Sequence, residues 1–158
     1  MENGTCCFFG HREIKETEEL KKRLFDLIEY LIVNKKIDIF LFGSKSKFNS
    51  LCLQTVTDIK KKHPHIKRIY ARAEYPYIDA DYKKYLMEFY DDTYYSEKLL
   101  NSGRSAYIKR NYEMIDKSGY CVVYYSEEEV PKNRKSGTKI AYNYALKKGK
   151  TIINIANV

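Results

Sequence analysis

Several residue types and patterns are scarce in this chain of 158 residues, and each absence narrows what the protein can be. Tryptophan is absent, proline occurs three times, and no apolar stretch approaches the roughly 18–20 residues that a membrane-spanning helix needs. The first residues lack the basic start and the long apolar segment of a secretory signal peptide. We therefore expect a cytoplasmic protein with no membrane partner.

The four cysteines do not form a metal-binding or redox motif. Cys6 and Cys7 are adjacent, whereas Cys52 and Cys121 stand alone, so the spacing of a CxxC motif is missing. Neighbouring side chains of a strand point to opposite faces of the sheet, so Cys6 and Cys7 should enter different cores. The sequence predicts buried free thiols, and we expect neither a metal nor a cofactor.

The net charge of +8 indicates an anionic partner, but the position of the charge is more informative than its size. Lysine outnumbers arginine and tyrosine is abundant, which is a composition that an AT-rich genome imposes on proteins of any function. Charge alone therefore does not identify a nucleic-acid-binding protein. The basic residues gather in two loops, with Lys45 and Lys47 in one and Lys132, Arg134, Lys135 and Lys139 in the other.

Short apolar runs alternate with longer helical segments along the chain, without a repeat or a linker. This alternation is typical of an α/β protein in which helices cover both faces of a parallel sheet. We expect residues 1–158 to form a single Rossmann-like, three-layer domain with about five strands in the order 3-2-1-4-5. The strands should begin near Thr5, Ile37, Ile66, Tyr120 and Thr151.

Helical periodicity fills most of the intervals between these strands. The pattern predicts helices over 16–33, 49–62, 104–117 and 137–148. In the third helix, Ile108, Tyr112 and Ile115 form the apolar stripe. Gly119 is expected to cap the end of that helix. Residues 74–100 are rich in tyrosine and acidic side chains, and they predict one or two short helices.

Three loops that follow predicted strands contain glycine or basic residues. They are Gly10 to Arg12, Gly43 to Lys47 and Lys135 to Lys139. Ligands of open parallel sheets bind beyond the carboxyl ends of the strands, where loops lead into helices. Glycine lets the backbone approach a ligand, and the free N–H groups at a helix start favour a phosphate. The chain has no Walker motif and no GxGxxG motif. The prediction of a phosphate site therefore depends on the three loops, which we expect at the same edge of the sheet.

Four segments, in order along nearly the whole chain, resemble the motifs of one family. Cys6 to Arg12 resembles its opening strand and turn, and Gly43 to Asn49 resembles its second glycine loop, commonly Gly-Gly-Ala-x-Gly-Phe-Asp. Arg110 to Asp116 resembles its Arg-Asn-x-x-Met-Val-Asp helix, and Ser136 to Thr138 resembles its Gly-Gly-Thr loop. This family is the YpsA-like branch of the SLOG superfamily. The superfamily includes the Lonely Guy phosphoribohydrolases, the DNA-processing protein DprA, and sensor domains of bacterial immunity that bind nucleotide-derived signals.

The resemblance implies a Rossmann-like fold, a homodimer or larger homo-oligomer, and a nucleotide-like ligand over the glycine loops. Arg110 would reach into the site as a bidentate phosphate clamp. His11 also fits a turn residue, and Met114 also fits a core residue. The ligand-binding residues that we expect from the loops and the resemblance are Gly10, His11, Arg12, Gly43, Ser44, Lys45, Phe48, Asn49, Arg110, Asn111, Met114, Ser136, Gly137 and Thr138.

The chain departs from the family where hydrolysis needs an acid. The phosphoribohydrolases carry Pro-Gly-Gly-x-Gly-Thr-x-x-Glu, and here Lys139, Ile140 and Ala141 occupy the positions where the glutamate would fall. Other carboxylates that could assist cleavage are Glu74, Asp79, Asp81, Glu113 and Asp116. We therefore expect the protein to bind a nucleotide signal, for sensing or sequestration, rather than to cleave it. The alternatives are a nucleotide N-glycosidase of the Lonely Guy type and DprA-like binding of single-stranded DNA.

Overall fold

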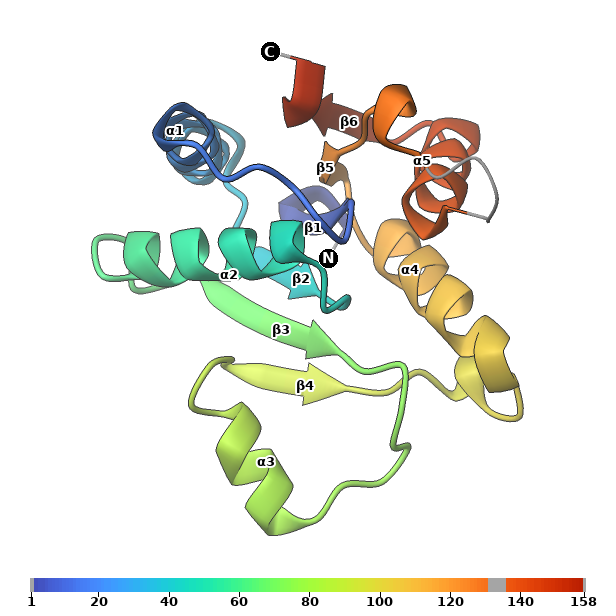
Figure 1. Ribbon diagram of the computed structural model, residues 1–158. Coiled ribbons are helices and arrows are strands. Elements are labelled where there is room, and N and C mark those ends of the chain that lie inside the picture. Colours follow the sequence, from blue (N-terminus) through green and yellow to red (C-terminus); the bar gives the residue numbers. More distant parts are fainter. Residues whose placement is uncertain (1, 131–135, 158) are drawn as a thin grey trace.

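The computed structural model describes residues 2–130 and 136–157, and it is an α/β protein built on one parallel sheet. The strands are β1 (Thr5–Gly10), β2 (Ile39–Phe42), β3 (Lys67–Ala71), β4 (Asp92–Tyr94), β5 (Tyr120–Tyr124) and β6 (Thr151–Asn154). Their order is β4-β3-β2-β1-β5-β6, and every neighbouring pair is parallel. Helices lie on both faces of this sheet, as the Rossmann-like expectation requires (Figure 1).

The five expected strands are present as β1, β2, β3, β5 and β6, and their expected order is confirmed. The expected count of five is wrong, because β4 adds a sixth strand beside β3. β4 has three residues, Asp92 to Tyr94, and none of them is fully buried. Such a short edge strand lacks the apolar run by which a buried strand is recognised in a sequence.

β1 lies between β2 and β5 and is buried along its whole length. Its side chains alternate between two cores, with Cys6 and Phe8 in one and Cys7 and Phe9 in the other. The opposite placement of the two neighbouring thiols is therefore confirmed. All four cysteines are buried and free.

Five α-helices accompany the sheet, and four of them start at a capping side chain. They are α1 (Glu18–Lys35), α2 (Lys47–Lys60), α3 (Ala80–Leu86), α4 (Ala106–Asp116) and α5 (Gly137–Lys147). The side chains of Thr17, Ser46, Asp79 and Ser136 accept a hydrogen bond from an N–H group in the first turn of α1, α2, α3 and α5. In the described residues, none of these helices has the length and apolar character to cross a membrane.

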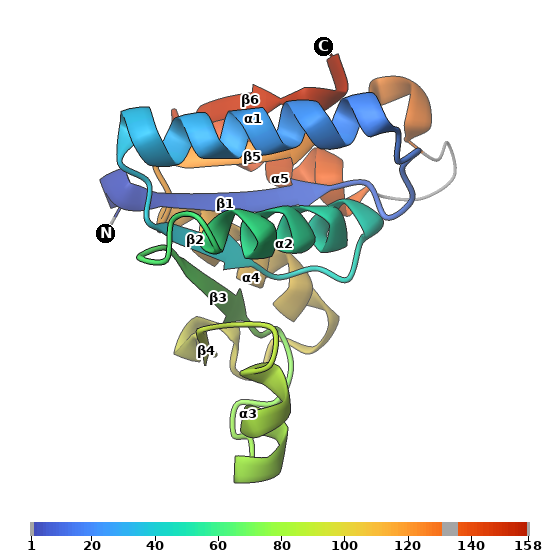
Figure 2. The same cartoon turned by 90° about the vertical axis from the view of Figure 1, so that its left-hand side faces the viewer.

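The helices form two layers. α1 and α2 cover one face of the sheet, and α4 and α5 cover the other, while α3 stands off the edge beyond β4 (Figures 1 and 2). The core under α1 and α2 contains Phe8, Phe40 and Phe42. The core under α4 and α5 contains Met114 and Ala141.

α4 buries a different face from the one that its apolar stripe predicted. Arg110 and Met114 are buried together with Ile115, whereas Ile108 and Tyr112 are only partly buried. The predicted glycine cap is also wrong, because α4 ends at Lys117 and Gly119 does not have a positive φ. A β-carbon on Gly119 would lie 2.8 Å from the carbonyl oxygen of Glu2, so the glycine there permits a close contact between two backbone segments.

Candidate functional site

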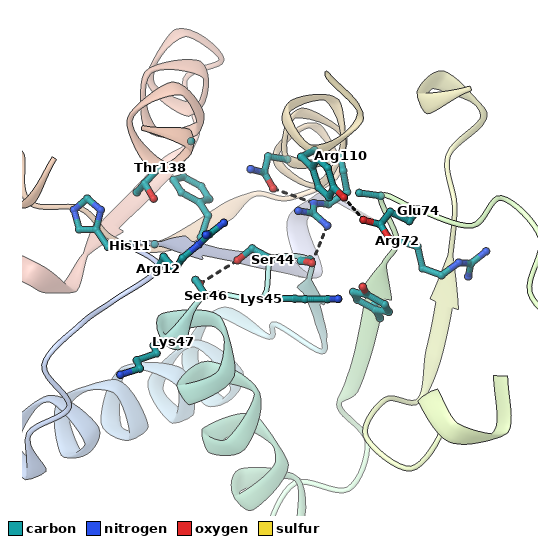
Figure 3. Close-up of a pocket in the computed structure, with 18 of the residues that line it drawn as sticks. His11, Arg12, Ser44, Lys45, Ser46, Lys47, Arg72, Glu74, Arg110 and Thr138 are labelled. Atoms are coloured by element: carbon teal, nitrogen blue, oxygen red, sulfur yellow. Dashed lines mark hydrogen bonds between the residues drawn. The ribbon is translucent and has the colours of Figure 1, made fainter. Parts of the chain in front are cut away.

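A cavity of about 990 Å³ lies at the carboxyl ends of β1, β2 and β3 and includes the start of α5 (Figure 3). Its volume is at the upper end of the roughly 300–1,000 Å³ that is common for ligand pockets. The strand order changes direction between β1 and β5, next to this cavity. Open parallel sheets bind ligands at such a switch point, because loops from both sides leave the sheet there.

Eleven of the fourteen expected ligand-binding residues line this cavity. They are Gly10, His11, Arg12, Gly43, Ser44, Lys45, Arg110, Asn111, Ser136, Gly137 and Thr138. The three loops and α4 therefore meet at one place, although they are far apart in the sequence. That they hold a ligand remains a prediction.

The structure does not bring Phe48, Asn49 and Met114 to the cavity. Phe48 is fully buried beneath Gly10, where a β-carbon on the glycine would lie 2.4 Å from Phe48 Cδ2. Asn49 is buried, and its Oδ1 lies 3.5 Å from the N–H nitrogen of Gly43, which donates to it. Met114 is fully buried in the core under α4 and α5. Phe48 and Asn49 support the loops from behind, Met114 belongs to the core, and none of the three lines the cavity.

Of the four cationic residues that the sequence places in the third loop, only Lys139 lies in the described part of the chain. Lys132, Arg134 and Lys135 lie outside the described residues. Lys139 Nζ lies 3.3 Å from a carboxylate oxygen of Glu127, so its charge is already partnered.

Arg110 is the cation that the fold holds most firmly at the cavity. Only 5% of Arg110 is exposed, and its Nη1 donates to the carbonyl oxygen of Gly43 at 2.7 Å. Its Nε donates to Asn111 Oδ1 at 3.1 Å (Figure 3). Burial lowers the pKa of the guanidinium. In the described part of the chain, Arg110 forms no ion pair with a carboxylate, although the nearby charge of Glu74 acts on it. A buried cation without a close ion pair is costly.

Backbone donors are available in the second loop. Within residues 2–130 and 136–157, the N–H groups of Ser44 and Lys45 have no hydrogen-bond acceptor. The start of α2 offers less, because the N–H of Lys47 donates to the carbonyl oxygen of Arg12 at 2.8 Å and the N–H of Asn49 donates to Ser46 Oγ at 3.0 Å. Ser44 and Lys45 therefore supply free N–H donors from the loop.

The start of α5 supplies two further backbone N–H groups that are free to bind an anion. Among the described residues, the N–H groups of Gly137 and Thr138 have no acceptor, whereas that of Lys139 donates to Ser136 Oγ at 3.1 Å. Unpaired N–H groups and the helix dipole together favour an anion at this end of the cavity.

His11 is occupied by the protein itself. His11 Nε2 lies 2.9 Å from the backbone nitrogen of Ser126 and 3.1 Å from its carbonyl oxygen, so the ring is hydrogen-bonded to this residue. The ring is buried and joins the loop after β1 to the turn after β5. Its contacts fit the turn residue that the sequence allowed better than they fit a general base.

Sequence reasoning missed a further wall of the cavity, which follows β3. Arg72 is 7% exposed, and its Nη1 donates to Thr93 Oγ1 at 2.9 Å. Its Nε donates to the carbonyl oxygen of Tyr75 at 3.2 Å, and burial lowers the pKa of this guanidinium too. The signal that could have found this wall is its position, because residues after any parallel strand lie at the same edge of the sheet.

Glu74 belongs to the same wall and is the one carboxylate that lines the cavity among the five considered as acids, which all lie in the described part of the chain. It accepts a hydrogen bond from the hydroxyl of Tyr107. Glu113 instead pairs with Lys117 at 3.1 Å, and Asp116 accepts a hydrogen bond from the Tyr144 hydroxyl at 2.8 Å.

Comparison with known proteins adds no relative, because no family model matches the chain and no curated protein matches it. The SLOG resemblance therefore depends on the motifs of the sequence. Within the described residues, no group of three His, Cys, Asp or Glu side chains could hold a metal ion. The chemistry that the site offers is that of cations, backbone N–H groups and tyrosines.

Proposed function

We propose that the cavity binds a phosphate-containing nucleotide or a ligand derived from one, as a SLOG-like sensing or sequestering protein would. The observation that carries this proposal is Arg110, a buried cation at the carboxyl edge of the sheet without a carboxylate partner among the described residues. A buried charge is costly unless it is paired, so a bound anion would complete the site.

The charges around Arg110 also favour an anion. Five cationic side chains line the cavity, and they are Arg12, Lys45, Lys47, Arg72 and Arg110. Three carboxylates line it, and they are Glu13, Glu74 and Glu129. Lys47 Nζ and a carboxylate oxygen of Glu13 lie 2.9 Å apart and offset each other, so the remaining charge of the described lining is positive.

Calorimetric titration with nucleoside monophosphates, ADP-ribose and inorganic phosphate tests the proposal. We expect the nucleotides to bind, and we expect Arg110→Lys and Arg110→Ala to weaken binding roughly tenfold or more, because hydrogen bonds to charged groups are strong. Arg104→Ala is the matched control, since Arg104 is exposed just before α4 and does not line the cavity. Binding that is absent, or equal in all these proteins, would contradict the proposal. A single-stranded oligonucleotide completes the panel, because DprA-like binding would make it the tightest ligand.

Hydrolysis of the N-glycosidic bond is a second candidate function, and the position of Glu74 on the cavity favours it. An oxocarbenium-like centre needs a nearby carboxylate, and Glu74 could provide one from a different segment than the family motif does. We expect base release from nucleoside monophosphates to stay at background, because Glu74 is exposed and pairs with a tyrosine hydroxyl. Multiple turnover that disappears in both Arg110→Ala and Glu74→Gln would replace the binding function with an enzyme.

Self-association is part of the same proposal, since the SLOG resemblance implies it. The segment around α3 exposes several large aromatic side chains, which are Tyr75, Tyr77, Tyr85 and Phe89. Exposed apolar patches commonly mark contact surfaces. Light scattering at tens of micromolar protein should give a mass above that of one chain, and a strict monomer would remove this part of the proposal.

A further inference from the structure

The two ends of the cavity differ in chemistry. Arg12, Thr138 and the free N–H groups lie near the ends of β1 and β2 and the start of α5, whereas the Lys45 side chain extends towards β3 (Figure 3). The end near β3 is lined by four tyrosines, which are Tyr70, Tyr75, Tyr82 and Tyr107. β2 separates β3 from β1 in the sheet, so the tyrosines and the loop after β1 lie on opposite sides of Gly43 and Arg110.

Tyr75, Tyr82 and Tyr107 present surface that the described chain does not cover, and Tyr107 is 47% exposed. Tyr75 is 58% exposed, and Tyr82 is partly exposed at the start of α3. Their ring centroids lie 6.0 Å apart at an interplanar angle of 79°, which is an edge-to-face pair. A flat aromatic ligand that stacked on either ring would bury apolar area in a cavity that is otherwise polar.

The backbone, rather than ring packing, fixes the position of Tyr75. Its φ is +61°, in the left-handed region that non-glycine residues rarely adopt. Such a conformation persists where neighbouring groups hold it. Arg72 Nε donates to the carbonyl oxygen of Tyr75, and Arg72 is itself anchored to Thr93. The backbone at Tyr75 is therefore held before any ligand arrives, which lowers the entropy lost on binding.

Glu74 lines the cavity close to Arg110, and it accepts a hydrogen bond from the Tyr107 hydroxyl (Figure 3). A carboxylate repels a phosphate, but it accepts hydrogen bonds from ribose hydroxyls, as acidic residues do in dinucleotide-binding folds. The cavity therefore offers cations for a phosphate, a carboxylate for ribose hydroxyls and aromatic rings for a base.

We propose that the tyrosine end of the cavity holds the nucleobase, which stacks on Tyr75 and Tyr82 while Glu74 accepts hydrogen bonds from the ribose hydroxyls. The ligand class is then a 5′-phosphorylated ribonucleotide, and the base contributes to affinity as well as the phosphate. This assignment depends on the proposed phosphate-binding function, which it extends to the orientation of the ligand.

The experiment compares ribose 5-phosphate with the four common nucleoside 5′-monophosphates by calorimetric titration. For the unchanged protein, we expect the best monophosphate to bind roughly tenfold or more tightly than ribose 5-phosphate, because base stacking on an aromatic side chain is strong. Tyr82→Leu should remove most of this difference and leave the affinity for ribose 5-phosphate unchanged. Tyr77→Leu is the matched control, because Tyr77 belongs to the same segment, is 92% exposed and does not line the cavity.

Glu74→Gln gives a separate readout. It should reduce the preference for a ribonucleotide over the 2′-deoxyribonucleotide with the same base, since the amide is a weaker acceptor than the carboxylate. The Glu74→Gln variant should lose less affinity for ribose 5-phosphate than the Arg110→Ala variant does.

The titrations distinguish failure of the base assignment from failure of the proposed phosphate-binding function. If ribose 5-phosphate binds as tightly as every monophosphate, or if Tyr77→Leu weakens binding as much as Tyr82→Leu, the base assignment is overturned and the phosphate site stands. If neither ribose 5-phosphate nor any monophosphate binds, the proposed function fails and the base assignment fails with it.

Discussion

A β-carbon on residue 43 would lie 2.7 Å from Cδ of Arg110 and 2.8 Å from its Nε, so Gly43 leaves the space that the guanidinium occupies. Real β-carbons do not approach other heavy atoms this closely, and the contact would displace the arginine. The sequence suggested that this glycine lets a ligand approach the backbone. In the structure, the glycine also admits a cation from α4, which then donates to the Gly43 carbonyl oxygen.

The first prediction follows from that contact. Gly43→Ala should displace Arg110 and weaken nucleotide binding roughly tenfold without changing a charge, and the loss of one hydrogen bond should lower stability by about 1 kcal/mol. Calorimetric titration and urea denaturation measure the two effects. The double variant Gly43→Ala with Arg110→Ala should bind little worse than Arg110→Ala alone, because both changes remove the same interaction. Additive losses would show that Gly43 acts independently of Arg110.

The second prediction concerns the start of α5. Among the described residues, a β-carbon on Gly137 meets no atom within 4 Å, so substitutions there should fold. Gly137→Asp places a negative charge in the first turn, which should stabilise the helix by about 0.3–1 kcal/mol and repel a phosphate. We expect a higher melting temperature together with weaker nucleotide binding. Gly137→Asn is the neutral control of equal size, and equal affinities for the two variants would place the phosphate elsewhere.

The third prediction tests the conformation of Tyr75. Tyr75→Gly should relieve a left-handed backbone that costs a tyrosine roughly 1 kcal/mol, and it should remove a ring that lines the cavity. Thermal denaturation should therefore show equal or greater stability while nucleotide affinity falls. Tyr77→Gly provides the contrast, because Tyr77 does not have a positive φ and gains nothing from glycine. A Tyr75→Gly variant that binds as well as the unchanged protein would exclude the ring from the ligand site.

The fourth prediction concerns the ion pair that joins β3 to β4. Arg68 donates from Nε to Asp91 Oδ2 at 3.0 Å and from Nη2 to Asp91 Oδ1 at 3.1 Å. Partial burial raises the pKa of Asp91, but the hydrogen bonds and charge of Arg68 outweigh it, and the net pKa lies below the ordinary 3.8. The pair therefore stabilises the fold above about pH 4, and this contribution is lost as the pH falls through the lowered pKa.

Asp91→Asn should accordingly lower the free energy of unfolding by about 1–2 kcal/mol near neutral pH. Urea denaturation at a series of decreasing pH values should show the difference in the free energy of unfolding between the variant and the unchanged protein becoming smaller. A difference that is constant from neutral to strongly acidic pH would mean that the carboxylate charge does not stabilise this edge of the sheet.

The sequence predicted most of the fold because its central strands are buried on both faces. Runs such as Ile37 to Phe42 are apolar apart from Asp38, and helices of at least eleven residues separate most of them. β4 was missed because an edge strand of three residues needs only one partner and no apolar run. Its position depends on Arg68 and Asp91, which are 23 residues apart, and such a pairing leaves no local pattern.

The candidate site was predicted where it depends on loops and missed where it depends on tertiary contacts. Glycine and basic residues identified the loops after β1 and β2, and these do line the cavity. The burial of Arg110 was not predicted, because helical periodicity assigns a charged residue to the solvent face. Arg72 and Tyr75 were missed because no glycine follows β3, so nothing in that segment resembled a ligand loop.

The central place of β1 has a consequence for the newly made polypeptide. β1 pairs with β5 from Cys6 opposite Tyr120 to Gly10 opposite Tyr124, so the ribosome must add more than a hundred residues after β1 before this neighbour exists. At roughly 5–20 residues per second, this takes on the order of 5–25 s. α5, which supplies one wall of the cavity, is synthesised later still. If the cavity binds a nucleotide as proposed, that ligand can therefore stabilise only a polypeptide whose translation is nearly finished.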